Sequence, residues 1–250
     1  MTVLEVQDLK KGFTSRKKTF TAVDGISFRL EQGQGLGIVG ESGSGKSTIA
    51  KMITHLIEPT GGRIFLMGRD ITAVKGKALR ETYRAMQMVF QMPAESFDPR
   101  RTLGDGVGES LRNMGMKRAE VKRRVDELLV RCGLTPEFAG RYPHEVSGGQ
   151  CQRAAIARAL AVKPAVLICD EATSALDVTV QKQILALLAT LKQEEGYSFL
   201  LICHDLALVQ AFCDQVLVLY RGKTVEYGTP EEIIQHPKMA YTRRLIDSVL

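Results

Sequence analysis

A glycine-rich stretch at residues 40–48, GESGSGKST, contains the spacing G-x-x-x-x-G-K-S in full. An apolar run at 36–39 precedes it, and apolar residues at helical spacing follow it at 49–53. The stretch therefore lies between a predicted strand and a predicted helix, as this motif requires. Glycines let the backbone curl so that successive N–H groups point at phosphate oxygens, and the helix start adds further free N–H groups. The stretch predicts a phosphate-binding loop on an α/β fold.

The side chains of this loop supply the rest of a nucleotide site. Lys46 would reach the β- and γ-phosphates, and the Ser47 hydroxyl would ligate Mg²⁺. The candidate nucleotide-binding residues of the loop are Gly40, Glu41, Ser42, Gly43, Ser44, Gly45, Lys46, Ser47 and Thr48. An overlapping G-x-G-x-x-G at Gly35, Gly37 and Gly40 is no dinucleotide site, because these glycines follow a polar turn and do not open a helix.

The composition is that of an ordinary globular chain. Hydrophobic residues make up 44% and charged residues 25% of 250 residues. No apolar run approaches the roughly 18 residues of a membrane span, and the first residues do not read as a signal peptide. The 5 cysteines never form C-x-x-C, which favours small buried residues in a reducing compartment over bridges or metal ligands. We expect a cytosolic protein, with any membrane association coming through a partner.

The net charge of +6 includes basic clusters at 16–18 and 122–124. Neither cluster has interleaved aromatic residues, and the simplest interpretation is a solvated face. Attraction to an anionic membrane surface is the alternative. No nucleic-acid recognition motif accompanies the charge, so no nucleic-acid partner is expected.

The order of predicted elements indicates one inserted unit. Residues 96–162 are mostly helical, and the segments on either side alternate strands with helices. We therefore expect a single domain, with an α/β core at 1–95 and 163–250 and a helical subdomain at 96–162. The expected strands are 3–8, 22–23, 26–30, 63–67, 88–90, 165–169, 198–203, 216–220 and 224–227, and the main expected helices are 77–87, 118–132, 178–194 and those that start at 147 and 229.

Polar side chains end three of the apolar strands, at Gln91, at Asp170 with Glu171, and at His204. Ligands bind at the carboxyl ends of strands in open α/β sheets, so these residues and the loop are expected at one edge. Asp170 can bind Mg²⁺ directly or through water, while Glu171 polarises the attacking water. His204 is expected to contact the γ-phosphate, and Gln91 to touch the metal or its water.

A second phosphate-type element, Ser147-Gly148-Gly149-Gln150, places small residues and free amides at a helix start. The chain already has one phosphate loop far away in sequence. A second anion site therefore needs either a second ligand or a second copy of the protein.

Together these motifs resemble the ATPase cassette of ABC transporters over essentially the whole chain. Besides the glycine-rich loop, Gln91 resembles the Q-loop and His204 the switch histidine. Residues 146–150 resemble the signature, with valine for the usual leucine. Residues 165–171 resemble the Walker B strand, and Ser174-Ala175-Leu176-Asp177 resembles the D-loop. Phe13 falls where the family stacks an aromatic ring on adenine. The resemblance implies a P-loop NTPase (RecA-like) core with an N-terminal antiparallel β subdomain and an inserted α-helical subdomain, and ATP and Mg²⁺ as cofactors.

The resemblance also implies partners. Two cassettes would form a head-to-tail homo- or heterodimer in which the signature of one subunit supplies amides and Ser147 to the ATP on the other. Gly148, Gly149, Gln150 and Asp177 are counted with the nucleotide-binding residues. Two transmembrane permease subunits would convert closure and opening into alternating access, and an extracytoplasmic solute-binding protein would act indirectly. The chain would then lie peripherally at the cytoplasmic face of the inner membrane, with the loop after Gln91 receiving the coupling helix of the permease.

Within the family, three segments are similar to the oligopeptide, dipeptide and nickel import group: FQMPAESFDPR at 90–100, ALDV at 175–178 and HPKMAYT at 236–242. Ala172 replaces the proline usual after the catalytic glutamate, as in some second-type subunits. The chain lacks the cysteine-rich C-terminal extension of the longer peptide-type ATPases, which favours the short nickel or metal-chelate type. The expected cargo is therefore peptides or nickel and metal chelates, moved by an active ATPase.

Three other classes are open. A soluble ABC protein acting on ribosomes or DNA usually carries two cassettes or long coiled-coil insertions, and this chain has neither. A P-loop kinase would give no reason for the element at 147–150. A subunit of a non-transport complex of the phosphonate-degradation type resembles the same import group and is the main alternative.

Overall fold

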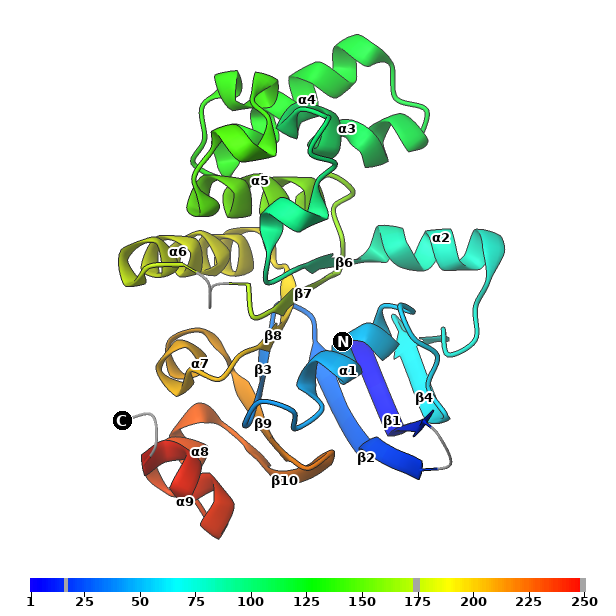
Figure 1. Cartoon of the computed structure of the whole chain (residues 1–250), viewed down its shortest axis with the longest axis vertical. Coiled ribbons are helices and arrows are strands. Elements are labelled where there is room, and N and C mark those ends of the chain that lie inside the picture. Colours follow the sequence, from blue (N-terminus) through cyan, green and yellow to red (C-terminus); the bar gives the residue numbers. More distant parts are fainter. Residues whose placement is uncertain (16–17, 173–175, 248–250) are drawn as a thin grey trace.

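The structure, a computed structural model, describes residues 1–15, 18–172 and 176–247 (Figure 1). Its strands form a four-stranded sheet in the order β2-β1-β4-β5 and a six-stranded sheet in the order β10-β9-β3-β8-β7-β6. The strands are β1 (Thr2–Ser15), β2 (Lys18–Glu31), β3 (Gly35–Val39), β4 (Gly61–Leu66), β5 (Arg69–Asp70), β6 (Met86–Val89), β7 (Val166–Asp170), β8 (Ser198–Ile202), β9 (Gln215–Tyr220) and β10 (Lys223–Gly228).

The helices gather in three places. In Figure 1, α3, α4 and α5 lie together above the six-stranded sheet, α8 and α9 lie below it, and α1, α2, α6 and α7 flank it. The helices are α1 (Lys46–Ile53), α2 (Gly76–Ala85), α3 (Leu103–Asn113), α4 (Arg118–Arg131), α5 (Gly148–Leu160), α6 (Val178–Glu195), α7 (Leu206–Phe212), α8 (Pro230–Gln235) and α9 (Ala240–Asp247), with 3₁₀ turns at Pro93–Ser96, Pro136–Gly140 and Pro143–Glu145. Among the described helices, none is long and apolar enough to cross a bilayer.

The central strands of the six-stranded sheet are buried on both faces. Strands β9, β3, β8, β7 and β6 run parallel, and every residue of β3, β7 and β8 is buried. Successive side chains of a strand point to opposite faces. In β7, Val166 and Ile168 accordingly join the cluster with α1 and the four-stranded sheet, and Leu167 and Cys169 join the cluster with α5, α6 and α7. This double burial explains the continuous apolar runs in the sequence.

The prediction of several short strands before residue 35 was wrong in length. Strands β1 and β2 form one antiparallel hairpin of 14 residues each, because bulges interrupt the alternation that the sequence pattern relies on. Asp8 lies at a bulge with φ of 48°, and Gly25 in the facing strand has φ of 74°. Each bulge moves the following residues to the other face, so one strand looks like several.

The boundaries around β6 were also predicted wrongly. The helix expected at 77–87 ends at Ala85, and the strand expected at 88–90 is Met86–Val89. Met86 and Gln87 pair with Val166 and Leu167 of β7, a tertiary contact that local periodicity does not contain. Phe90 is therefore outside the strand and 36% exposed. The segment expected as a loop after Gln91 holds the Pro93–Ser96 3₁₀ turn, and α3 was not placed individually within the helical stretch.

Candidate active site

The glycine-rich loop connects β3 to α1 in a conformation that needs its glycines. Gly40 has φ of 151°, and a Cβ atom there would collide with the Leu219 carbonyl of β9. Gly45 has φ of 110°, and a Cβ there would lie 2.5 Å from the Ala22 carbonyl. The Ser44 N–H donates to the Glu41 carbonyl at 3.1 Å and closes the turn. The loop is thus wound tightly against two neighbouring strands.

Lys46 is folded back into this loop. It is 5% exposed, and its Nζ donates to the carbonyls of Gly40 at 2.6 Å and Glu41 at 2.9 Å. Burial lowers the pKa of Lys46, and the carboxylates of Glu171 and Asp170 oppose that shift. The ammonium is therefore inside the loop, in electrostatic reach of both acids.

One buried hydroxyl of the loop makes no hydrogen bond to the described residues. The Ser44 Oγ is buried and finds no hydrogen-bond partner among the described residues. A buried polar group without a partner costs free energy, so such a group at a functional loop points to a ligand. Phosphate oxygens would satisfy it, and they fit the glycine turn and the Lys46 ammonium.

Ser47 and Asp170 form the link between the loop and β7. The Ser47 Oγ donates to Asp170 Oδ1 at 3.0 Å, and Asp170 is 9% exposed. Burial raises the pKa of the Asp170 carboxyl, and the Ser47 hydrogen bond opposes that shift. The described residues contain no cluster of three or more His, Cys, Asp and Glu side chains that could hold a metal ion. A hydroxyl beside one carboxylate suits Mg²⁺, which takes its other ligands from phosphates and water.

The other strand-end residues meet at the same edge. Because β6, β7, β8 and β3 are parallel neighbours, the positions of Gln91, Glu171 and His204 follow the same ends of adjacent strands. Glu171 has φ of 47°, uncommon for a residue with a side chain, and its N–H donates to the Ile202 carbonyl at 2.8 Å. Positive φ at such a position often accompanies function.

His204 and Gln91 are exposed at that edge. His204 sits directly before Asp205, whose carboxylate caps α7 by accepting from the N–H groups of Ala207 at 2.8 Å and Leu208 at 3.2 Å. This cap fixes the backbone that presents the imidazole. Gln91 and Asp170 line the same hollow of about 420 Å³.

The element at 147–150 is a capped helix start that faces solvent. The Ser147 Oγ accepts from the Gln150 N–H at 3.3 Å, and the Gln150 Oε1 accepts from the Ser147 N–H at 2.9 Å, a capping box. Ser147 and Gly148 are exposed, whereas Gly149 is buried against α6. A Cβ on Gly149 would collide with Val180. The second glycine therefore has a packing role whatever it binds.

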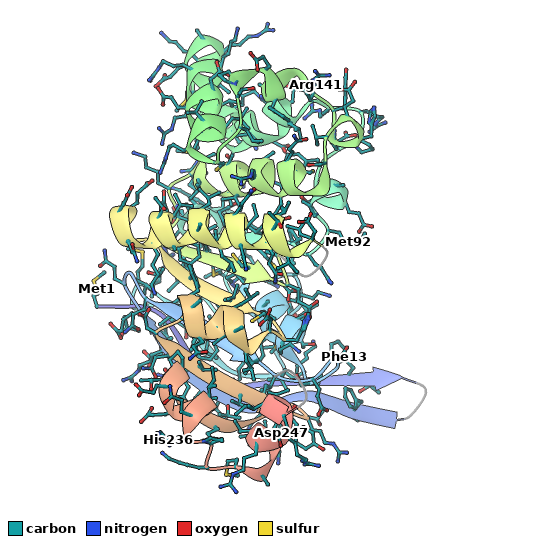
Figure 2. The ribbon with its side chains drawn as sticks, turned by 90° about the vertical axis from the view of Figure 1, so that its left-hand side faces the viewer. Met1, Phe13, Met92, Arg141, His236 and Asp247 are labelled. Carbon is teal, nitrogen blue, oxygen red and sulfur yellow. The ribbon has the colours of Figure 1, made fainter. Side chains whose placement is uncertain are left out.

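Two further candidates lie elsewhere. Asp177 caps α6, where its carboxylate accepts from the Val180 N–H at 3.0 Å; Ser174 and Ala175 of the same motif lie outside the described residues. Phe13 is 42% exposed on β1, with the Lys11 Nζ 5.1 Å from its ring centroid. In Figure 2, Phe13 and Met92 lie on the side of the molecule opposite Met1.

Sequence reasoning missed two residues near the loop. Lys51 lines the same hollow as Gln91, and its charge opposes the rise that burial causes in the pKa of Asp170. Its position one helical turn after Ser47 was the available signal. Tyr241 reaches Glu41 from α9. The available signal for Tyr241 was the segment at 236–242, whose similarity to the import group does not itself indicate a contact with the loop.

Comparisons with known proteins decide the family. The profile of the family described as ABC transporter matches residues 23–174. The chain belongs to this family. The ATPase is 45% identical over 247 residues to the oligopeptide transport ATP-binding protein OppF of Escherichia coli (strain K12), covering 98% of this chain and 74% of OppF. It is also 45% identical to the oligopeptide transport ATP-binding protein AppF of Bacillus subtilis (strain 168), covering 99% of this chain and 78% of AppF.

Solved cassettes share the fold. The dimeric post-hydrolysis structure of MJ0796 bound to ADP and Pi has a TM-score of 0.83 and 28% identity, covering 91% of this chain and 98% of that one. CbiO1 from Clostridium perfringens, part of the cbiONQ transporter complex, has a TM-score of 0.83 and 29% identity, covering 94% of this chain and 91% of CbiO1. The predicted α/β P-loop fold and the predicted ATP-hydrolysing transport ATPase are confirmed.

Proposed function

We propose that this chain is the motor subunit of a peptide importer, peripheral to the cytoplasmic face of the membrane, and that it drives uptake by binding and hydrolysing ATP. The observation that carries this proposal is the Ser47–Asp170 hydrogen bond beside the buried Lys46 ammonium. It joins the phosphate loop to the acidic strand end and brings a cation, two oxygen donors and the backbone N–H groups of the loop to one place.

Each side chain of the edge has one task in this proposal. Lys46 would bind the β- and γ-phosphates, and Ser47 and Asp170 would hold Mg²⁺, which supplies charge neutralisation when bound. Glu171 would orient and deprotonate the attacking water, because its carboxylate follows β7 directly. His204 would donate toward the γ-phosphate, and Gln91 would contact the metal or its water. Phe13 would stack on adenine.

We infer that the site is completed by a second cassette. The first turn of α5 at Ser147 and Gly148 is exposed, and Asp177 opens the neighbouring helix α6. An exposed helix N-terminus with a serine hydroxyl suits the γ-phosphate of a partner. Residues 96–162, which include α3, α4 and α5, would act as the signature subdomain.

A hollow between the core and α3 supports a permease partner. It holds about 350 Å³ and lies between β6 and α3, lined in part by Leu56, Tyr83, Phe90 and Asn113. Leu56 is 52% and Tyr83 is 37% exposed there. Apolar side chains around a concave surface suit a short helix from another protein, and Gln91 follows Phe90 directly.

Peptides are the favoured cargo because OppF and AppF are named for oligopeptide transport. Nickel or metal chelates are the second candidate, because the segments at 90–100, 175–178 and 236–242 resemble the oligopeptide, dipeptide and nickel import group as a whole. A non-transport complex of the phosphonate-degradation type is the alternative function.

Co-expression with the products of adjacent genes tests the proposal. A peptide importer should co-purify with two membrane-embedded permease subunits, and its ATPase rate in proteoliposomes should rise when the matching binding protein carries peptide. Stimulation by a nickel-loaded binding protein and not by peptide would select the second cargo. Co-purification with soluble enzymes alone would contradict transport.

A further inference from the structure

The last helix of the chain touches the nucleotide loop. The Glu41 N–H donates to the Tyr241 hydroxyl of α9 at 3.2 Å, across 200 residues of sequence. Tyr241 is 7% exposed, so the tyrosine end of this contact is buried, whereas Glu41 itself is exposed. In Figure 1, α9 lies beneath β9 and β10, at the end of the sheet where these strands pass the loop. Figure 2 shows the same helix from the side, ending at Asp247.

Tyr241 bonds to the peptide group that also holds Lys46. The Glu41 N–H and the Gly40 carbonyl belong to one planar peptide group, in which they point in opposite directions. The Gly40 carbonyl accepts from the Lys46 Nζ at 2.6 Å. A hydrogen-bonded chain therefore runs from the lysine ammonium through this peptide to the tyrosine hydroxyl, and its bonds polarise one another.

The tyrosine side chain is held in place from one side. Its ring lies 4.2 Å from the ring of Tyr220, centroid to centroid, at an interplanar angle of 34°. The Arg221 guanidinium lies 5.1 Å from the centroid of the Tyr220 ring. The next residue, Gly222, donates its N–H to the Ser44 carbonyl of the loop at 2.9 Å. The β9–β10 turn and Tyr241 thus contact the loop together.

The helix that carries Tyr241 is tied to the sheet by one carboxylate. Glu226 of β10 accepts from the N–H groups of Lys238 at 2.9 Å and Met239 at 3.3 Å and from the Thr242 hydroxyl at 2.6 Å. Burial raises the pKa of Glu226, but these hydrogen bonds outweigh it and leave the pKa lowered. The carboxylate therefore stays charged and fixes the first turn of α9 beside the loop.

We propose that Tyr241 is a positioning residue of the nucleotide site, which orients the 40–41 peptide so that its carbonyl holds Lys46 in the loop. The proposal rests on the proposed function, because it needs the loop to be the ATP site. It also gives a physical role to the segment at 236–242. Tyr241 contacts no reacting atom, so its loss should weaken nucleotide binding and leave the hydrolysis step itself nearly unchanged.

The test uses the full chain with Tyr241→Phe, which keeps the ring and removes the hydroxyl. One hydrogen bond of this kind corresponds to about a threefold to tenfold change in affinity. We expect the Kd and KM for ATP to rise by about that factor, with kcat changed less than twofold, because binding is lost equally in the ground and transition states. Amide hydrogen exchange of the 40–46 loop should become faster, since the Glu41 N–H loses its acceptor.

Tyr220→Phe is the matched control, because it removes a hydroxyl from the other ring of the same pair. It should leave the Kd for ATP and loop exchange unchanged. Glu226→Gln, which weakens the tie of α9 without touching the loop, should shift the Kd in the same direction as Tyr241→Phe. If Tyr241→Phe lowers thermal stability while the Kd, KM and loop exchange stay at wild-type values, the tyrosine is only structural and the proposal is wrong.

A nucleotide control separates this proposal from the proposed function. Lys46→Ala should abolish ATP binding. If it binds ATP as the wild type does, the loop is not the ATP site and both proposals fail. If Lys46→Ala fails to bind while Tyr241→Phe binds and exchanges normally, only the role of Tyr241 is refuted.

Discussion

Asp170 is a buried carboxyl group, and burial disfavours its charged form. Burial raises its pKa above the ordinary value of 3.8. The folded chain therefore holds this proton more tightly than the unfolded chain does. Protonated Asp170 therefore stabilises the folded chain at low pH. This contribution is lost as the pH rises from the Asp170 pKa of the unfolded chain through that of the folded chain. Once ionised, the buried carboxylate destabilises the fold.

Asp170→Asn should therefore stabilise the nucleotide-free protein. The amide keeps an oxygen that can accept from Ser47 and removes the buried charge. We expect the free energy of unfolding at pH 7 to rise by about 1 kcal/mol, and the Tm by about 2–4 °C. The loss of stability as the pH rises above the ordinary carboxyl pKa should also become shallower. Thermal denaturation across this pH range measures both effects, and ATPase activity should be lost. A lower Tm for Asp170→Asn at pH 7 would refute this account.

Glu171→Gln tests the proposed role of Glu171 as the general base. The amide cannot take a proton from water, so turnover should fall by at least about 10²-fold. ATP binding should persist, and ATP-bound dimers should accumulate, which size-exclusion chromatography in the presence of ATP would detect. Glu120→Gln, at an exposed position of α4, is the control and should change neither property. Normal hydrolysis by Glu171→Gln would remove Glu171 from the reaction.

At the scale of elements, the start of α5 is positioned by its contact with α6. Gly149→Ala would push a methyl group into Val180 and should destabilise the protein by about 1–3 kcal/mol. Gly148→Ala is the control, since its nearest neighbour, Leu176, lies at an ordinary 3.4 Å.

A double-mutant cycle by denaturant unfolding tests this contact. Val180→Ala removes the colliding methyl groups, so Gly149→Ala combined with Val180→Ala should lose less stability than the sum of the two single changes. Additive losses would show that the helices do not meet as described.

At the scale of the whole molecule, the proposed head-to-tail arrangement places the exposed signature and the phosphate loop of one chain in different ATP sites. Ser147→Arg should leave ATP affinity at the Lys46 loop of the same chain within about twofold, because the Ser147 side chain bonds to Gln150 at its own exposed helix start. It should lower hydrolysis by the assembled complex by about 10²-fold or more, because the arginine blocks the partner's phosphates. Equilibrium binding and phosphate release measure the two quantities. Equal loss of both would contradict a head-to-tail arrangement.

Local patterns were sufficient where one segment determines its own structure. The loop at 40–48, the Thr229 capping box, the α6 boundary at Val178 and the continuous apolar strands β3, β7 and β8 all depend on neighbours in sequence. Because parallel strands align their ends, the pairing of Asp170 with Ile202, two residues before His204, also followed from order alone.

Contacts between distant segments could not be predicted in this way. The start of β6 at Met86 depends on pairing with β7, and the length of β1 on bulges against β2. The same holds for the Tyr241–Glu41 contact, which joins residues 200 positions apart. The sequence alone determined the glycine turn and the side-chain types of the candidate site, because a phosphate-binding loop is a local turn with a few kinds of side chain. Only the tertiary structure decided which other segments hold that turn in place, because packing brings together residues whose pairing leaves no periodic pattern.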